Sequence, residues 1–381
     1  MIKRVAEEKL IELSGFFKAI AVVGPRQSGK TTLVKKVFKN KPYVSLENMD
    51  TRLFASSDPR GFLATYKNGA ILDEVQRVPE LFSYLQEVLD NTTKKGLFIL
   101  TGSNNFLLQE GITQSLAGRI GYLTLLPFSL AELPKVSDKE LLFQGCYPPI
   151  YDQKIPPTDW FDNYIRTYIE RDVRQLKAIS DLMLYERFVR LLAGRVGQEL
   201  NYTSIGVEVG IDAKTVQSWL SLLESSFIIY RLKPYHNNFN KTIVKRPKLY
   251  FHDVGLVCAL LGINQITQLD FHPLRGALFE NMVVSEWMKQ LSNRGMKWNT
   301  YFWRDKTGRE IDFIIDINGK SIPIEIKSGQ TVKKDFYKHL NYWAKLTGEK
   351  LAYLAYAGER REEHSDGIVV ENWRKIKLID F

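Results

Sequence analysis

Cysteine and histidine are scarce in this chain of 381 residues, which contains two cysteines, Cys146 and Cys258, and five histidines. Two cysteines cannot build a framework of disulfides, and the scattered histidines exclude a zinc site with the usual Cys and His spacing. Low cysteine usage also fits a reducing compartment. The sequence therefore excludes a disulfide-stapled or zinc-binding scaffold and predicts a cytoplasmic protein.

Long apolar runs are also absent, because no stretch approaches the roughly 20 residues that a membrane-spanning helix needs. The first ten residues, MIKRVAEEKL, are charged and amphipathic. They lack the apolar centre and the small-residue cleavage site of a secretory signal. We therefore expect neither secretion nor a membrane partner.

Acidic residues are too few to balance the basic ones, with 43 Asp and Glu against 53 Lys and Arg, a net charge of +10. This balance favours an anionic partner, of which nucleic acid, here DNA, is the commonest large one. A basic protein that binds no nucleic acid is the alternative. The length exceeds one ordinary core, so we expect two or three domains.

The order of apolar runs predicts an α/β chain that is organised in three parts. Strands are expected at residues 19–23, 43–46, 70–72, 97–101 and 122–126, with helical patterns between them. Continuous apolar strands that alternate with helices indicate a parallel sheet covered on both faces. Residues 155–235 are mostly helical, and an α/β pattern of another layout follows. The expected domains are 1–150, 151–248 and 249–381.

The strongest motif is a glycine-rich loop of the form GxxxxGK[ST], placed between an apolar strand and a helical run. Its glycines let backbone N–H groups wrap phosphates at the start of the helix, so it predicts an ATP site. Lys30 is expected to reach the β- and γ-phosphates, and the Thr31 hydroxyl to bind Mg²⁺. The predicted nucleotide-binding residues are Gly24, Pro25, Arg26, Gln27, Ser28, Gly29, Lys30, Thr31 and Thr32.

Acidic residues follow the predicted strand at 70–72, about forty residues after the loop. We expect Asp73 to hold Mg²⁺ through water and Glu74 to act as the base that polarises the attacking water. Ser103 or Asn104, after a later strand, is expected near the γ-phosphate, although an ordinary turn is the alternative. Arg119 is a candidate arginine finger for a neighbouring subunit of a homo-oligomer, or else the member of a structural salt bridge.

Residues 201–224 have the pattern of a helix-turn-helix. Thr203 or Ser204 is expected to cap the first helix, Gly210 to form the turn, and Asp212 to cap the second helix. The strands that follow are expected to form a wing, joined by a basic loop with Lys233, His236, Lys241, Lys245 and Arg246. Such a module either binds duplex phosphates or serves as a lid that packs behind the ATPase domain.

Acidic residues and a lysine recur near the C-terminus in the order of a PD-(D/E)xK nuclease. Asp312 belongs to one strand of a hairpin, and Glu325 and Lys327 lie two residues apart on the other, so they share a face. Glu280 is expected to approach from a preceding helix. Glu280, Asp312 and Glu325 would hold Mg²⁺ or Mn²⁺, and Lys327 would orient the attacking water. A degenerate fold that only binds is the alternative.

The whole chain resembles a bacterial and archaeal group of AAA-type ATP-binding proteins that end in a restriction-endonuclease-like domain of uncharacterised function. The resemblance rests on the strings GPRQSGKTTL, ILDEVQRVP, LTGSNN, SLAGRI and YIRTYIERDVRQL. In the C-terminal part it rests on KLYFHDVGLVCALLG, GALFENMVVSEW and REIDFIIDINGKSIPIEIKSG. It implies an AAA-type P-loop domain, a helical or winged-helix middle segment and a nuclease-like domain. Asp253 falls on one of these strings, and we interpret it as structural.

Three functions are consistent with this sequence. The first is an ATPase that acts on DNA through a metal-dependent nuclease domain. The second is an ATP-dependent DNA-binding or regulatory scaffold whose nuclease-like domain is inactive. The third is a signalling ATPase whose basic charge is incidental, and it predicts no DNA binding even near about 50 mM salt.

Overall fold

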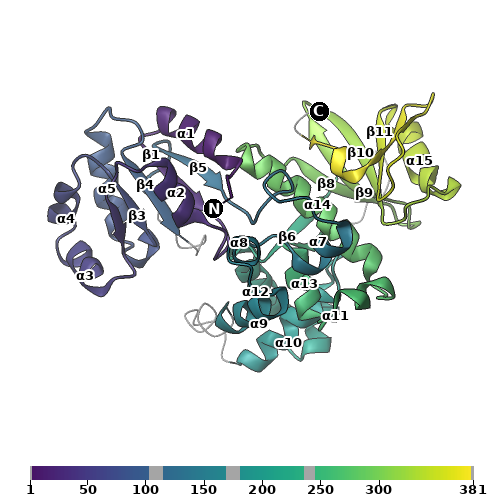
Figure 1. Ribbon diagram of the computed structural model, residues 1–381, viewed down its shortest axis with the longest axis horizontal. Helices are drawn as coiled ribbons and strands as arrows, with labels where there is room; N and C mark the ends of the chain where they lie inside the picture. Colours follow the sequence, from purple (N-terminus) through teal and green to yellow (C-terminus); the bar gives the residue numbers. More distant parts are fainter. Residues whose placement is uncertain (1, 103–114, 169–180, 236–244, 379–381) are drawn as a thin grey trace. The chain divides into compact units, whose positions relative to one another are not determined.

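The structure is a computed structural model that describes residues 2–102, 115–168, 181–235 and 245–378. The chain forms two compact units, each of which is described by itself (Figure 1). Unit 1 comprises Met1–Glu132, Ser225–Ile228 and Leu291–Lys297, and unit 2 comprises Leu133–Glu224, Ile229–Gln290 and Trp298–Phe381.

Unit 1 contains a parallel sheet of five strands in the order β2-β3-β4-β1-β5. The strands are β1 (Ala19–Val23), β2 (Tyr43–Ser45), β3 (Ala70–Asp73), β4 (Phe98–Gly102) and β5 (Ile120–Thr124). Each lies within two residues of its predicted range, which confirms the α/β prediction for this part. Every residue of β1, β3 and β4 is buried, because these apolar strands are covered on both faces.

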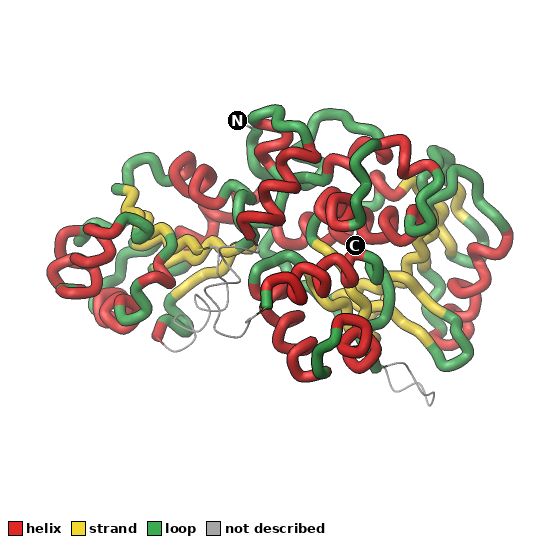
Figure 2. The backbone as a smooth tube through the Cα atoms, turned by 90° about the horizontal axis from the view of Figure 1, so that it is seen from below, coloured by secondary structure: helices red, strands yellow, loops and turns green. Residues whose placement is uncertain are grey.

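Helices lie on both sides of this sheet, where Figure 2 shows them in red around the yellow strands. They are α1 (Ala6–Phe16), α2 (Lys30–Val37), α3 (Met49–Ser57), α4 (Pro59–Thr65), η1 (Val75–Arg77) and α5 (Leu81–Asp90). Leu10 of α1, Leu33 of α2 and Ile20 of β1 share one hydrophobic core. This core holds α2, and therefore the loop before it, against the carboxyl end of β1.

The first part of unit 2 is helical. Its helices are α7 (Asp138–Gln144), α8 (Pro148–Asp152), α9 (Pro157–Tyr168), α10 (Leu182–Ala193), α11 (Tyr202–Val209), α12 (Ala213–Ser225) and α13 (Val254–Leu260). Residues 133–150 belong here and not with unit 1, which differs from the expected boundary at 150. The backbone N–H of Cys146 donates to Asp253 at 2.7 Å, and Asp253 also caps α13. Asp253 is therefore structural, as expected, and fixes the 133–150 segment inside unit 2.

The helix-turn-helix has the expected geometry at its turn. Gly210 has a φ of +91°, and Asp212 accepts hydrogen bonds from the backbone N–H groups of Lys214 and Thr215. The cap of α11 is Asn201 and neither Thr203 nor Ser204, because the Asn201 side chain accepts from the N–H three residues later. These contacts end α11 and begin α12 on either side of the turn.

Eight strands form the sheet of unit 2, in the order β12-β13-β11-β10-β9-β8-β6-β7. They are β6 (Ile229–Pro234), β7 (Lys248–Phe251), β8 (Thr300–Arg304), β9 (Glu310–Ile317), β10 (Lys320–Lys327), β11 (Ala352–Tyr356), β12 (Glu362–Glu363) and β13 (Ile368–Asn372). The remaining helical elements are η3 (Ile266–Asp270), α14 (Arg275–Asn293), η4 (Lys334–Tyr337), α15 (Lys338–Thr347) and η5 (Trp373–Lys375). The asparagine-glycine turn joins the antiparallel strands β9 and β10, as predicted.

The strands expected to form a separate wing are instead part of this sheet. β6 and β7 pair antiparallel, as the strands of a wing do, but β6 also pairs with β8 in parallel through Lys233 and Pro234. The expected boundary at 248 consequently falls at the first residue of β7. The wing is absorbed because β6 and β7 are buried at most positions, so their apolar side chains need a larger sheet to pack on.

Candidate functional site

The glycine-rich loop of unit 1 has a backbone that turns back on itself between β1 and α2. Gly24, Gln27 and Gly29 have φ angles of +147°, +62° and +92°. A Cβ atom on Gly24 would lie 2.1 Å from the carbonyl oxygen of Leu125, so only glycine fits there. Residues 24–32 thus form the predicted strand-loop-helix unit, and this geometry suits a bound phosphate.

Lys30, the first residue of α2, is nearly buried and lies over the loop. Its ammonium donates to the carbonyl oxygens of Gly24 at 2.9 Å and Pro25 at 2.7 Å. Both acceptors are neutral, whereas a phosphate oxygen is charged and makes the stronger hydrogen bond. The residues present therefore fit a nucleotide phosphate. A bound phosphate would replace the two carbonyl oxygens as the hydrogen-bond acceptor of the Lys30 ammonium.

Asp73 ends β3, and the structure brings it together with Thr31 as predicted. The Thr31 hydroxyl donates to Asp73 Oδ2 at 3.1 Å. The Tyr43 hydroxyl donates to the same oxygen at 2.6 Å, and the Thr101 hydroxyl donates to Oδ1. A carboxylate and a hydroxyl at this distance are the ligand types that Mg²⁺ uses in P-loop sites. This pair is the part of the site that could hold the metal.

Sequence reasoning missed Tyr43 and Thr101 as partners of Asp73. The position of Thr101 contained a signal, because it is the register partner of Asp73 at the end of the adjacent strand β4. Tyr43 lies at the start of β2 and reaches Asp73 only through its long side chain. Burial raises the pKa of the Tyr43 hydroxyl, and the hydrogen bond to Asp73 raises it further. Tyr43 therefore remains a protonated donor that orients Asp73.

Glu74 follows Asp73 with a left-handed backbone, at a φ of +54°. Its carboxylate accepts a hydrogen bond from the side-chain amide of Gln76, which is two residues later and buried. Gln76 is a further residue of this site that sequence reasoning missed, and it restrains the predicted base. Ser103 and Asn104, the other predicted residues near the γ-phosphate, lie outside the described residues.

Arg4 anchors the glycine-rich loop from the start of the chain and was not predicted. Its guanidinium donates to the Ser28 carbonyl at 2.6 Å and to Glu132 Oε1 at 2.9 Å. Glu132 also accepts from the backbone N–H of Ser129 at 2.7 Å. No motif contains Arg4, so nothing in the sequence pointed to it. The loop is consequently fixed to the two ends of the 1–132 segment.

Arg119 lies at the opposite edge of the sheet from the loop of its own subunit. Strands β1 and β5 are parallel, with Ala19 beside Ile120 and Val23 beside Thr124. Arg119 comes just before the first residue of β5, whereas the loop comes just after the last residue of β1. Five strand residues at about 3.3 Å each separate the two edges by roughly 16 Å. The Arg119 guanidinium pairs with Asp90 of α5 at 2.5 Å and lowers the pKa of that carboxyl. Arg119 therefore makes the predicted alternative, a salt bridge, within its own chain.

The hairpin of β9 and β10 in unit 2 brings together Asp312, Glu325 and Lys327, as predicted. The Lys327 ammonium lies 2.6 Å from Glu325 Oε1 and 3.5 Å from Asp312 Oδ2. Asp312 Oδ2 also accepts from the backbone N–H of Ile326 at 2.8 Å. The two carboxylates and the ammonium thus form one compact cluster at the carboxyl end of β10.

The Glu325 carboxylate has an unsatisfied oxygen. Glu325 is 4% exposed, and its Oε2 atom is buried without a hydrogen-bond partner among the described residues. Burial and the nearby Asp312 carboxylate raise the pKa of Glu325, Lys327 opposes them, and together these effects place the pKa at about 8. A buried acceptor without a donor beside a second carboxylate suits a divalent cation. The pair of Asp312 and Glu325 therefore fits a metal.

Glu280 is not part of this cluster. Its carboxylate accepts from Lys248 Nζ at 3.1 Å and from the Tyr250 hydroxyl, both of which belong to β7. Lys248 also pairs with Glu310 on β9. In the part of the chain that the structure describes, no group of three or more His, Cys, Asp or Glu side chains is arranged to hold a metal ion. The expected third ligand thus bonds to Lys248 and Tyr250 in an ion-pair network, although its charge still raises the pKa of Lys327.

Lys248 is the centre of this network, and sequence reasoning missed it. The only signal was a lysine at the start of the apolar run KLYF. Burial alone would lower the pKa of Lys248, but Glu280 and Glu310 outweigh burial and raise it. Lys248 therefore remains an ammonium between two half-buried carboxylates.

We expect Lys248→Met to destabilise unit 2 by about 3–5 kcal/mol, because Glu280 and Glu310 would lose their common cation. All seven tryptophans of the chain belong to unit 2, so tryptophan fluorescence during urea denaturation follows that unit alone. Lys320→Met is the matched control, since Lys320 is exposed on the same sheet and should change stability by less than about 0.5 kcal/mol. Equal stability of the two variants would contradict a stabilising role for the network.

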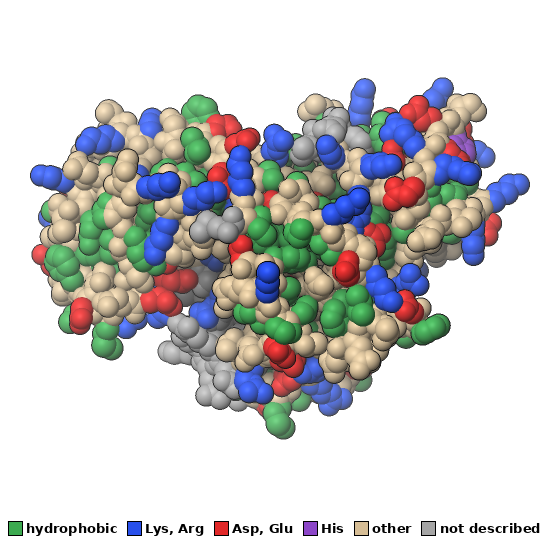
Figure 3. All heavy atoms as spheres, in the orientation of Figure 1, with side chains coloured by type: hydrophobic (Ala, Val, Ile, Leu, Met, Phe, Trp, Pro, Cys, Tyr) green, Lys and Arg blue, Asp and Glu red, His purple; other side chains and the backbone are tan. Residues whose placement is uncertain are grey.

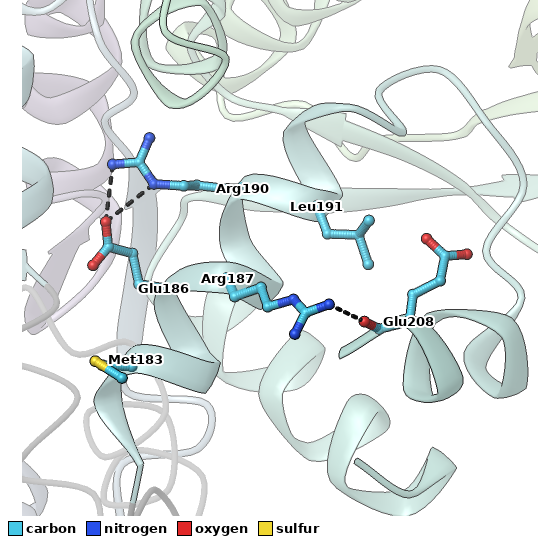
Figure 4. Close-up of a pocket in the computed structure, with 6 residues that line it drawn as sticks. All are labelled: Met183, Glu186, Arg187, Arg190, Leu191 and Glu208. Atoms are coloured by element: carbon cyan, nitrogen blue, oxygen red, sulfur yellow. Dashed lines mark hydrogen bonds and ion pairs between the residues drawn. The ribbon is translucent and has the colours of Figure 1, made fainter. Parts of the chain in front are cut away.

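A hollow of about 710 Å³ lies between α10 and α11, beside the helix-turn-helix (Figure 4). The Arg187 guanidinium donates to the Glu208 carbonyl at 2.9 Å, and Arg190 pairs with Glu186 at 2.9 Å. Both arginines thus have protein partners already. On α12, Lys214 is exposed. Of the expected basic loop, Lys233, Lys245 and Arg246 are exposed, and the other members, His236 and Lys241, lie outside the described residues.

The surface shows no single basic stripe on the face drawn in Figure 3. Lys and Arg side chains are spread over the visible parts of both units and are mixed with acidic ones. Among the described residues, no helix is long and apolar enough to span a membrane.

Comparisons with known proteins divide the chain into three segments. Residues 16–134 match the model of a family described as AAA domain. Residues 137–267 and 275–376 match two families described as domains of unknown function, DUF8612 and DUF4143. Two relatives cover 92% of this chain at 28% identity, over 79% of their own length. They are the uncharacterized proteins Mb2031c of Mycobacterium bovis and Rv2008c of Mycobacterium tuberculosis.

Solved structures give only distant likenesses. The Walker-type ATPase PABY2304 of Pyrococcus abyssi aligns at 14% identity with a TM-score of 0.44, over 67% of this chain and 94% of that one. RuvB T158V of Thermotoga maritima aligns at 14% identity with a TM-score of 0.30, over 60% and 90%. Likenesses at these scores carry no weight in the assignment. The AAA match covers the glycine-rich loop, Asp73 and Glu74, and an ATPase fold of this kind implies the use of ATP with Mg²⁺. Residues 16–134 are therefore similar to AAA domains, and this segment carries the P-loop of unit 1.

Proposed function

We propose that this chain is an AAA-type ATPase that acts on DNA and cleaves it at the cluster of Asp312, Glu325 and Lys327. The main support is the Glu325 carboxylate, which contacts Lys327 through one oxygen and has its other oxygen buried without a donor. Two carboxylates and an ammonium on one hairpin are the groups that metal-dependent phosphodiester hydrolysis uses. The net charge of +10 favours a polyanionic substrate.

Each residue of this cluster has a separate task in the proposed reaction. Asp312 and Glu325 would hold the Mg²⁺ or Mn²⁺ ion. A bound divalent ion supplies stabilisation of the negative charge that develops on the phosphate oxygens. Lys327, whose pKa is raised by Asp312 and Glu325 against the effect of burial, remains charged and positions the attacking water. Glu280 stays with Lys248 and supports the strands that carry the cluster.

Each residue of the ATP site in unit 1 also has a separate role in the proposed hydrolysis. Lys30 exchanges the Gly24 and Pro25 carbonyls for phosphate oxygens. Thr31 and Asp73 would hold Mg²⁺, which neutralises charge on the phosphates when bound. Glu74 accepts the proton of the attacking water once Gln76 releases it. ATP binding is thus expected to rearrange both Lys30 and Glu74.

The direct test is incubation of the full chain with plasmid, linear and branched DNA, with Mg²⁺ or Mn²⁺, in the presence and absence of ATP. We expect metal-dependent cleavage, and its ATP dependence shows whether the ATPase gates the nuclease-like site. Absence of cleavage on every substrate would reject the nuclease proposal.

A DNA-binding or regulatory scaffold is the second candidate, and the position of Glu280 favours it. Because Glu280 is committed to Lys248, the cluster has two carboxylates where three were expected. This candidate predicts DNA binding that weakens with salt but produces no cleavage. A signalling ATPase without a DNA partner would show no binding even at about 50 mM salt, where phosphate contacts are least suppressed.

Arg119 supports a homo-oligomer as the active form. Its position at the edge of the sheet away from its own loop leaves the site of a neighbouring subunit as the only ATP site that it could serve. This role requires the exposed pair with Asp90 to open, at a small cost, since water screens exposed ion pairs.

We expect a mixture of Arg119→Ala and Glu74→Gln subunits to recover part of the ATPase activity that each variant lacks alone. In mixed oligomers an intact Arg119 from one subunit meets an intact Glu74 in the other. Steady-state phosphate release measured over a range of mixing ratios provides the readout, and Arg60→Ala, which removes another exposed ion pair of unit 1, is the control. Full activity of Arg119→Ala by itself would end the finger hypothesis.

A further inference from the structure

The three strands β10, β11 and β13 run parallel, so their carboxyl ends lie at one edge of the sheet of unit 2. A cavity of about 820 Å³ lies at this edge. Its lining includes Ser328, the residue directly after Lys327, and Phe279, the residue directly before Glu280. Crevices outside the carboxyl ends of parallel strands are the usual ligand sites of open α/β sheets.

The cavity lining contains more basic than acidic side chains, and its acidic side chains are all in ion pairs. Asp138 pairs with Arg374 at 2.6 Å, and Lys139 pairs with Asp270 at 2.7 Å. Glu359 lies 3.8 Å from Lys375. The acidic side chains of the lining are therefore all matched by a cation.

Two basic side chains of the lining have no such match. Lys135 and Arg275 are exposed, and within the described ranges neither has an ion pair. Arg275 is the first residue of α14, and Lys135 precedes α7, so the two come from separate elements at the same cavity. Two uncompensated cations beside an acidic catalytic cluster favour an anionic ligand that extends past the cluster.

We propose that this cavity binds the sugar-phosphate backbone of the DNA strand next to the scissile bond, with Lys135 and Arg275 as phosphate contacts. The inference rests on the proposed action on DNA. It assigns the substrate path to Lys135, before α7, and to Arg275 of α14, both outside the hairpin of Asp312, Glu325 and Lys327. Phosphate contacts of this kind fix the register of a strand without reading its sequence.

The test is fluorescence anisotropy of a short fluorescein-labelled single-stranded oligonucleotide with the full chain in EDTA, across a salt series. Binding to single strands weakens with salt with a log–log slope of about −0.7 for each phosphate contact. The double variant Lys135→Gln and Arg275→Gln should therefore reduce the magnitude of the slope by about 1.4 and weaken binding at low salt.

Lys350→Gln is the matched control, because Lys350 is exposed and lies before β11, at the opposite edge of the sheet. It should keep the wild-type slope. Wild-type binding that the double variant leaves unchanged would overturn the proposed cavity while the proposed action on DNA stands. Absence of DNA binding by the wild type at every salt concentration would overturn both the cavity and the proposed action on DNA.

Discussion

Glu74→Gln should lower ATP turnover by about 10²–10⁴-fold and leave ATP binding intact. The amide has the size of the carboxylate but cannot take the proton of the attacking water. The substitution keeps Lys30 and Thr31, the groups expected to hold the phosphates and Mg²⁺, so the nucleotide should remain bound. Phosphate release and the fluorescence of a labelled ATP analogue measure the two effects separately.

Two further variants make this test specific. Glu80→Gln is the matched control, because Glu80 is exposed and should leave both turnover and binding unchanged. Lys30→Ala, in contrast, should abolish nucleotide binding itself, and turnover is then lost with it. Wild-type turnover in Glu74→Gln would exclude Glu74 as the base, and tight ATP binding by Lys30→Ala would contradict the P-loop assignment.

Lys327→Ala should reduce DNA cleavage by about 10²–10³-fold, the loss that follows removal of one charge-stabilising donor from an active site. Lys327 lies within 3.5 Å of both carboxylates of the cluster, so its loss removes the only cation that contacts them both among the described residues. Cleavage is followed on plasmid and branched DNA with Mg²⁺ or Mn²⁺. The ATPase rate serves as an internal measure of folding and should not change.

The control for this variant is Lys320→Ala, at the other end of the same strand β10. Its side chain is exposed, so cleavage should remain at the wild-type level. If Lys327→Ala and wild type cleave equally, the cleavage does not come from this cluster. If the wild type itself is inactive on all substrates, the scaffold candidate replaces the nuclease.

The sequence predicted the elements that are defined by local patterns. The P-loop, the five strands of unit 1 and the β9–β10 hairpin all depend on residues that lie close together in the chain. Asp312, Glu325 and Lys327 came together because antiparallel pairing places residues of two adjacent strands side by side. Strand alternation was sufficient for this part of the site.

The errors concern contacts between segments that are distant in the chain. The Glu280 carboxylate, expected at the metal site, bonds to Lys248 instead. This contact joins β7 to α14 across 32 positions. Tyr43 reaches Asp73, and Arg4 reaches Ser28, by long side chains whose direction no periodicity encodes. The expected wing became part of a larger sheet because burial of β6 and β7 is decided by strands that follow much later.

Unit 1 is assembled from three stretches of chain, since Ser225–Ile228 and Leu291–Lys297 belong to it together with Met1–Glu132. Phe227, Ile228 and Leu291 in these short stretches are buried. The ATPase is consequently not a detachable module. A fragment that stops at residue 132 or 150 would contain every P-loop residue and still lack two pieces of its own unit. Exchange of the C-terminal part between relatives would have to preserve both short stretches for the ATPase to fold unchanged.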